Sequence, residues 1–405
     1  MKYKDELIII LTITILIIFL KFINVLQIEN GFGKPLTMLL MILIFSIITI
    51  LIQRNINYNY KENKVNYQNL DILKYVSAIL IIILHMRPFL NFSDQLDLAF
   101  NNIVTRICVP IFLVITGYFV AKKEKINSNY IKEYIKKTIP LYVLWSIIYI
   151  PIIIAIIFQY QSVINSYLSS LNISFPLFIM LLALLLPIVL IVAFFYTGTY
   201  YHLWYFPALI FSLLLLKKWK QKFNIKYLLG MSFIFLLFGA TETYYGVLPL
   251  SIKELLSYYY NIFFTTRNFL FFGLFYVVLG YFMGSKEKVY SKNCFVKLIV
   301  SIFLLIFEAI LLHDIERLNS NILISCVPLT YYLFISTIYI TNYLKTTKIL
   351  AALSKYYYLI HPLVIFIISI FFKQLSDYPY LNILLILIIT HILSFIIIKI
   401  KEKYS

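Results

Sequence analysis

The chain has 405 residues, of which 62% are hydrophobic and only 13% are charged, and its formal net charge is +18. Soluble globular proteins have roughly 45–50% apolar and about 25% charged residues, so this chain is too apolar to cover its surface with polar groups. The excess Lys and Arg fall in short gaps between long apolar runs, as in membrane proteins. The composition therefore excludes a soluble enzyme, a nucleic-acid binder and a disordered protein, and it predicts a multi-pass protein of the plasma membrane in contact with lipid.

Crossing the hydrocarbon core takes about 20 mostly apolar residues in a helix. The predicted helices cover residues 7–26, 35–52, 71–92, 103–121, 139–160, 203–216, 227–243, 268–284, 296–312, 321–341, 356–373 and 380–398. The first run is too long for a signal peptide and lacks a small-residue cleavage site, so we expect it to be retained. The predicted fold is an all-α transmembrane bundle of about 12 spans. Residues 1–69 hold two additional helices and a polar connector, and residues 70–405 form a ten-helix membrane domain.

The basic residues predict the orientation of these helices. Lysines crowd the gaps 122–138 and 217–226, whereas the gap 93–102 contains two aspartates and no basic residue. Because cytoplasmic loops carry the excess of Lys and Arg, strict alternation of the gaps places both termini in the cytoplasm.

The same alternation bears on a further apolar run over residues 174–196. It requires residues 161–202 to leave and return on the outer side. The run is therefore expected to be re-entrant, to form a hairpin at Pro187, or to lie on the outer interface, and the alternative is a thirteenth span. A re-entrant element is tolerated where protein or a cavity surrounds it, so it would indicate a site.

Few ionisable residues lie within the apolar runs, and each is a functional hypothesis because of the cost of placing it there. His85 lies 15 residues after Leu70, or about 22 Å along a helix of 1.5 Å rise per residue, which places it in the outer half of the membrane. An imidazole with an ordinary pKa near 6.5 can take a proton from a hydroxyl group and return it. His85 is therefore a candidate general base, and a histidine bonded within the bundle is the alternative.

Three other charged residues allow two interpretations each. Lys74 either forms an interfacial pair with Asp71 or faces a cavity and attracts an anionic donor. Arg106 either extends to the outer interface or points inward. Glu308, in the run VSIFLLIFEAILLH, either pairs with His85 or Arg106 or is a protonated structural residue.

The remaining histidines are each expected to be structural. His202 and His313 are predicted near the outer interface, and His361 near the cytoplasmic end of its helix. Cys108, Cys294 and Cys326 show no metal-ligand spacing and no disulfide framework, so neither a metal site nor a disulfide scaffold is predicted.

Several segments resemble the integral-membrane acyltransferase 3 family. They are, in chain order, LDILKYVSAILIIILH, RICVPIFLVITGYFV, KKTIPLYVLWSIIYIP, GTYYHLWYFPAL, TTRNFLFFGLFYVVLGYF and YYLIHPL, and together they cover about residues 70–399. The pieces GTYYHLWYFPAL, ETYYG and TTRNFLFFGLFYVVLGY are in particular similar to the membrane module of vancomycin-resistance serine racemases. No segment resembles the soluble racemase domain of those proteins.

This resemblance implies a bacterial membrane O-acyltransferase. Its acyl group, often acetyl, comes from cytosolic acyl-CoA as co-substrate, with no bound cofactor, and goes to a hydroxyl of a cell-surface or lipid-linked glycan. His85 matches the family's essential histidine, and Lys74 stands at the preceding position that is usually arginine. Tyr134 and Lys137 replace the family's paired arginines.

The resemblance and the predicted topology together suggest a role for each remaining candidate. The acyl-donor-binding residues would be Lys74, Lys136 and Lys137, and Glu308 would assist His85 in catalysis. The residues expected at outer helix ends to bind the acceptor are Arg106, His202, Trp204, Arg267 and Asn268.

Two other functions are compatible with the sequence. The similarity to serine racemases would also fit a non-enzymatic transporter or exporter of an amino acid or glycan. A third hypothesis is a structural partner within glycan-synthesis machinery.

Overall fold

The computed structural model describes residues 67–404, with gaps at 91, 171–172, 288–292, 314 and 340–346. The predicted helices 7–26 and 35–52 and the connector as far as residue 66 lie outside the described residues, whereas Gln68 and Asn69 already belong to the first described helix. The described part of the chain is entirely helical and contains no strand, so the predicted all-α class is confirmed there.

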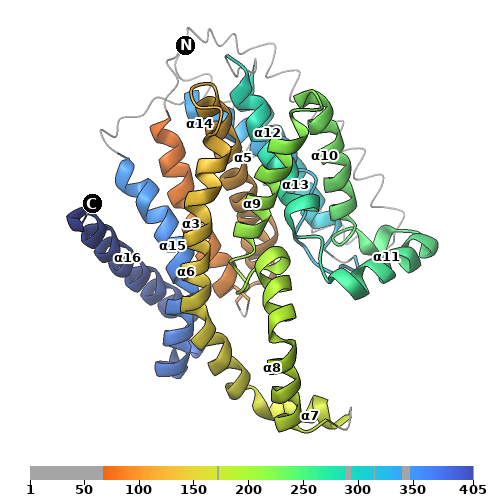
Figure 1. Ribbon diagram of the computed structural model, residues 1–405, viewed down its shortest axis with the longest axis vertical. Coiled ribbons are helices and arrows are strands. Elements are labelled where there is room, and N and C mark those ends of the chain that lie inside the picture. Colours follow the sequence, from red (N-terminus) through yellow and green to blue (C-terminus); the bar gives the residue numbers. More distant parts are fainter. Residues whose placement is uncertain are drawn as a thin grey trace.

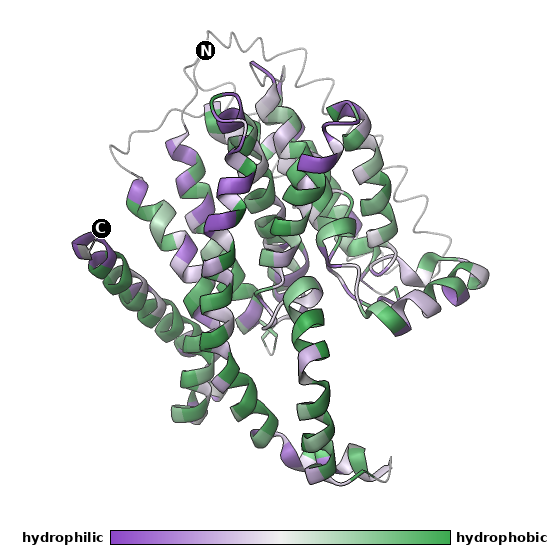
Figure 2. Cartoon of the chain, viewed as in Figure 1, coloured by the Kyte–Doolittle hydropathy of each residue, from purple (hydrophilic) through white to green (hydrophobic). Residues whose placement is uncertain are grey.

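Each apolar run predicted for the ten-helix domain contains a helix (Figure 1). These helices are α3 (Gln68–Met86), α5 (Cys108–Glu124), α6 (Tyr130–Gln159), α9 (Tyr205–Trp219), α10 (Ile225–Ala240), α12 (Leu274–Ser285), α13 (Cys294–Leu311), α14 (Cys326–Tyr339), α15 (Lys348–Phe371) and α16 (Pro379–Tyr404). Among the described residues, 6 helices are long and apolar enough to cross a membrane, or up to 7 if α7 and the first part of α8 form one bent span. Figure 2 shows the apolar residues that dominate their length. The count of twelve spans and the cytoplasmic termini stay predictions.

Shorter elements join these helices. They are α4 (Asp94–Asp97), η1 (Leu98–Ile103), η2 (Val104–Ile107), α7 (Gln161–Ser170), α8 (Phe175–Val192), η3 (Ala193–Thr197), η4 (Tyr245–Val247), α11 (Leu250–Phe263), η5 (Phe269–Gly273) and η6 (Lys373–Asp377). Segments η1 and η2 lead directly into α5, and the three together form one apolar helix over Leu98–Glu124. In the same way η5 and α12 together form one apolar helix over Phe269–Ser285.

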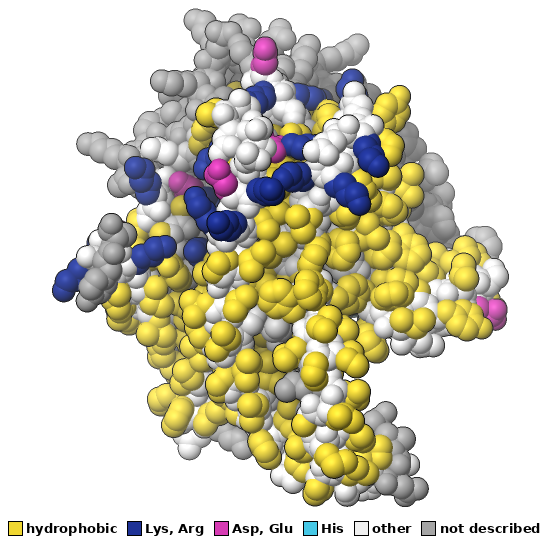
Figure 3. Space-filling model, viewed as in Figure 1, with side chains coloured by type: hydrophobic (Ala, Val, Ile, Leu, Met, Phe, Trp, Pro, Cys, Tyr) yellow, Lys and Arg dark blue, Asp and Glu magenta, His cyan; other side chains and the backbone are white. Residues whose placement is uncertain are grey.

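Basic residues gather at one end of the bundle, which we call the lysine-rich end. α5 finishes with Lys122 and Lys123, and α9 finishes with Lys217 and Lys218. In the view of Figure 3, Lys and Arg side chains gather in the upper part of the molecule, and a broad apolar surface lies below them. The positive-inside rule predicts that the lysine-rich end faces the cytoplasm.

The apolar run over 174–196 forms one helix, α8, which continues through Pro187. The predicted hairpin at Pro187 is therefore wrong, because membrane helices tolerate proline where neighbouring groups satisfy the freed carbonyl. The chain instead reverses at α7, which makes an angle of 92° with the first part of α8. In Figure 1, α6 runs down to this turn and α8 runs back up from it. Apolar side chains of α8 are exposed, including Leu184 (74% exposed) and Ile188 (60% exposed).

Helices α5 and α12 pack backbone to backbone at the centre of the bundle. A Cβ atom added at Gly280 would collide with the carbonyl oxygen of Val114, and one added at Gly117 would collide with the carbonyl oxygen of Val277. Membrane helices use small residues in this way to approach closely.

Gly280→Ala is therefore expected to destabilise the protein by about 1–3 kcal/mol, the usual cost of overpacking. Gly230→Ala is the matched control, because a Cβ atom at Gly230 in α10 meets nothing within 4 Å. That change should be neutral or stabilise by about 0.5–1 kcal/mol through helix propensity. Thermal unfolding in detergent measures both variants, and equal melting temperatures would contradict the packing argument.

Candidate functional site

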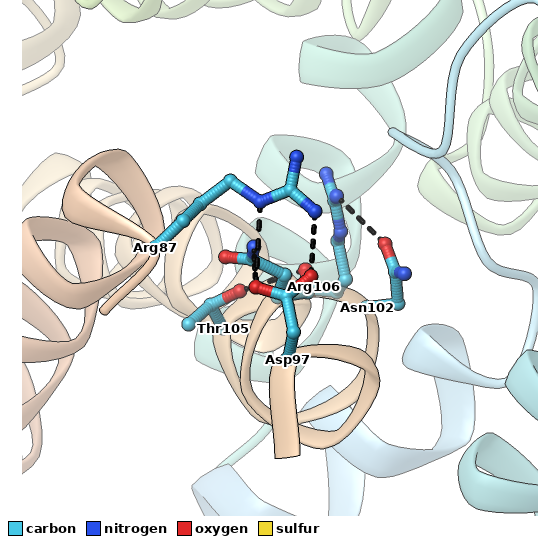
Figure 4. Close-up of polar contacts among 6 residues, drawn as sticks. Arg87, Asp97, Asn102, Thr105 and Arg106 are labelled. Carbon is cyan, nitrogen blue, oxygen red and sulfur yellow. Dashed lines mark hydrogen bonds and ion pairs between the residues drawn. The ribbon is translucent and has the colours of Figure 1, made fainter. Parts of the chain in front are cut away.

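His85 lies in the last turn of α3, which ends at Met86, short of the predicted end at residue 92. The helix stops because Arg87 adopts a left-handed conformation, with φ of 42°, which a non-glycine residue rarely adopts. Arg87 Nη2 lies 2.5 Å from Asp97 Oδ2, and Asn101 Nδ2 donates to Asp97 Oδ1 at 2.9 Å. Figure 4 shows this ion pair, with Arg106 beside it. The pair ties the end of α3 to α4 and η1, and it thereby fixes the position of His85.

His85 faces a small chamber of about 60 Å³. The residues that line it are Ile81, Leu84, His85, Thr105, Arg106, Val109, His202, Trp204, Arg267, Phe272, Asn321 and Tyr358. We call this space the histidine chamber. Five of the ten predicted site residues meet in it, although they come from separate segments: α3, η2, the turn before α9 and the turn before η5. Apart from Tyr358, which is in mid-helix, its polar residues lie at helix ends away from the lysine-rich end.

Three imidazole rings lie together at this chamber. The ring of His85 stacks on that of His361, with centroids 5.4 Å apart and planes at 17°. The ring of His202 lies edge-on to His361 at 5.6 Å. Among the described residues, no group of histidine, cysteine or acidic side chains is arranged to hold a metal ion. The three rings bring several nitrogen atoms together at one place in the bundle.

His361 was given no role from the sequence and was expected near the cytoplasmic end of its helix. The structure puts it in the middle of α15, because that helix begins at Lys348 and not at residue 356. His361 is fully buried, and its Nδ1 lies 2.8 Å from the carbonyl oxygen of Tyr357. Since a carbonyl only accepts, Nδ1 carries the proton and Nε2 is the acceptor. The sequence signal that could have identified His361 is that few histidines lie within apolar runs.

Two arginines enter the histidine chamber. Arg106 Nη2 donates to Asn102 Oδ1 at 3.2 Å, and the Arg267 guanidinium lies 4.9 Å from the centre of the Trp204 ring. Among the described residues, neither arginine forms an ion pair with a carboxylate.

Two predicted site residues lie elsewhere. Asn268 caps η5, because its Oδ1 accepts from the amides of Leu270 and Phe271 at 2.9 and 3.0 Å. Glu308 accepts from the amides of Ile324 and Ser325 at 2.6 and 2.7 Å, and from the Tyr244 hydroxyl. Neither residue lines the histidine chamber. The predicted pairing of Glu308 with His85 or Arg106 is therefore not formed.

A larger cavity of about 690 Å³ begins at the lysine-rich end, and we call it the lysine cavity. Lys74, Lys123, Lys137 and Lys355 line it. Lys74 is paired with Asp71 at 2.7 Å, whereas Lys136 is exposed and does not line the cavity. Lys123 and Lys355 were not singled out from the sequence, because they come from helices whose packing the sequence does not reveal.

The lysine cavity and the histidine chamber share Ile81, Val109 and Tyr358 as wall residues. These three side chains come from α3, α5 and α15. The Tyr358 hydroxyl donates to the carbonyl oxygen of His202, which holds the tyrosine against the histidine chamber. The lysine cavity and the histidine chamber therefore adjoin each other at these three side chains.

The chain is similar to a known protein family and to several curated proteins. The acyltransferase 3 family model, described as an acyltransferase domain, matches residues 67–399. Two amino-acid racemases of Enterococcus faecalis are similar: one is 26% identical over 349 residues (82% of this chain and 46% of the racemase), the other 28% over 285 residues (66% and 35%). A serine/alanine racemase of Enterococcus gallinarum is 24% identical over 349 residues, which are 84% of this chain and 46% of that protein.

The chain spans less than half the length of these curated relatives. No solved structure matches it. The family model, by contrast, covers most of the chain. The apolar helices of the chain are those expected of a membrane protein. The chain belongs to the acyltransferase 3 family.

Proposed function

We propose that this protein transfers an acyl group from acyl-CoA, bound at the lysine-rich end, to a hydroxyl of a glycan acceptor on the other side of the plasma membrane. The observation that carries the proposal is the shared wall between the lysine cavity and the histidine chamber. The two spaces adjoin at Ile81, Val109 and Tyr358, and in this proposal the acyl group passes these side chains to reach His85. Acetyl is the acyl group we favour, because it is the one often used by the resembling family.

The proposed reaction uses His85 as a general base. Its imidazole takes the proton of the acceptor hydroxyl as the oxygen attacks the thioester carbonyl. The carbon–sulfur bond then breaks, the CoA thiolate leaves, and the proton goes to the sulfur. His361 stacks on His85 and keeps its ring in place, and His202, Trp204 and Arg267 lie on the acceptor side.

Lys137→Gln and Lys355→Gln are each expected to raise KM for acyl-CoA about fivefold with little change in kcat, since an exposed charge contact is worth up to about 1 kcal/mol. Lys136→Gln is the matched control, because Lys136 is adjacent in sequence but does not line the lysine cavity. Steady-state kinetics at two salt concentrations measures the effect, which should shrink as salt screens the phosphates. Equal KM values for K136Q and K137Q would contradict the assignment.

A non-enzymatic transporter of an amino acid or glycan is the second candidate, and the relatives' names, which refer to amino acids, make an amino acid the first substrate to test. A transporter would move its substrate across a liposome membrane without acyl-CoA and leave it chemically unchanged. Mass spectrometry of the substrate recovered from proteoliposomes distinguishes the two functions: an ester adduct of acyl mass supports transfer, and unmodified substrate supports transport.

A further inference from the structure

Buried polar atoms without a partner gather around the histidine chamber. Arg106 Nε, Arg267 Nε, Asn321 Nδ2 and both ring nitrogens of His202 are buried and have no hydrogen-bond partner among the described residues. All four residues line the chamber. Because buried polar groups in native proteins almost always have partners, these atoms indicate a polar ligand or water.

The charge of the chamber narrows the chemistry of that ligand. Arg106 and Arg267 bring two positive charges into it, and none of the described carboxylates lines it. The buried carboxylates on adjoining segments are bonded elsewhere: Asp97 to Arg87, and Glu242 to the amide and hydroxyl of Thr266 at 3.0 and 2.9 Å. Burying a guanidinium without a carboxylate partner costs free energy, and neither of these two has such a partner among the described residues. Binding of an anion at the two guanidiniums would therefore be strongly favoured.

The shape of the chamber is also informative. The chamber is small, about 60 Å³, and it accommodates a compact polar group such as a carboxylate or a phosphate. Trp204 supports the Arg267 guanidinium from one side, which leaves its Nε–H donor free for a ligand. Guanidinium groups bind carboxylate and phosphate oxygens with paired hydrogen bonds.

We propose that the histidine chamber is an anion site, and that the acceptor carries a carboxylate or phosphate group that Arg106 and Arg267 bind. This inference deepens the proposed function and rests on it, because the bound anion is an acceptor only if the protein transfers acyl groups. The anionic group fixes the acceptor at one end, so that a hydroxyl elsewhere on the same molecule meets His85. Uronic acids, amino acids and sugar phosphates share this chemistry.

Binding to the full chain in detergent, without acyl-CoA, tests the proposal independently of catalysis. The probes are matched pairs that differ in the anionic group: glucuronate against glucose, L-serine against L-serinamide, and glucose 6-phosphate against glucose. Thermal shift of the unsubstituted chain gives the affinity. Fluorescence of Trp204, in a Trp145→Phe, Trp219→Phe background, reports binding at the site itself.

At least one anionic probe should bind about tenfold more tightly than its neutral partner, as expected for a charge-assisted contact. Arg106→Gln and Arg267→Gln should each remove that preference, whereas Arg317→Gln should keep it, because Arg317 does not line the chamber. The pair that shows the largest preference identifies the source of the anion.

Equal binding of every anionic probe and its neutral partner would overturn the proposal, and this comparison needs no variant that might misfold. The anion site is also refuted if the two glutamine variants keep the preference. Arg106→Lys retains the charge and should retain part of the preference. A chain that binds anions but transfers no acyl group would leave the anion site standing and refute only the acyltransferase function.

Discussion

His85→Ala is expected to lower kcat/KM for acyl transfer by a factor of about 10²–10⁴, the usual contribution of a general base. The reason is the position of His85, which ends α3 inside the histidine chamber and stacks on the buried His361. The measurement is the rate at which label from acyl-CoA enters an alkali-labile ester in membrane vesicles. KM for acyl-CoA should stay within a few-fold of the unsubstituted value, because His85 does not line the lysine cavity.

His313→Ala is the control, since His313 is exposed after α13 and lies outside both compartments. It should transfer acyl groups at the unsubstituted rate. The general-base assignment fails if H85A retains activity at an equal amount of folded protein. It also fails if H313A and H85A lose activity to the same extent.

Glu308→Ala is expected to lower stability by about 3 kcal/mol or more, which would reduce the yield of folded protein. Its carboxylate accepts hydrogen bonds from the amides of Ile324 and Ser325 and from the Tyr244 hydroxyl. Removal leaves two backbone donors and one hydroxyl without partners in a buried place, and each such group costs about 1–3 kcal/mol. Thermal unfolding in detergent measures the loss.

Glu308→Gln separates this structural role from a catalytic one. A glutamine retains one acceptor oxygen but turns an NH₂ group toward a backbone donor, so E308Q should be intermediate in stability. Its kcat per folded molecule should remain near the unsubstituted value. If the E308Q protein were stable but inactive, Glu308 would instead have a catalytic role.

The helices of the described part were predictable because apolar runs of about 20 residues form helices in lipid regardless of their neighbours. Their ends were less predictable. The left-handed turn at Arg87 depends on an ion pair with Asp97 from another element, and this ion pair has no signature in the local sequence. The start of α15 at Lys348, in the mixed stretch KILAALSK rather than at residue 356, concealed how deep His361 lies.

The candidate site was predictable only in part. Arg106, Trp204 and Arg267 were proposed because they occur at outer helix ends, and they do line the histidine chamber with His85. Asn268 comes from the same kind of position, but its side chain is used to cap a helix. Which side chains meet across helices depends on packing, and neither spacing nor composition specifies it.

We propose that an acyl group crosses from the lysine-rich end to an acceptor on the opposite face. The decisive experiment uses sealed membrane vesicles with the cytoplasmic face inside, loaded with labelled acetyl-CoA. Label should accumulate as alkali-labile ester on glycans of the outer face, and the H85A substitution should abolish this accumulation. Label that stays inside the vesicles, or ester formation equal in the unsubstituted and H85A proteins, would contradict it.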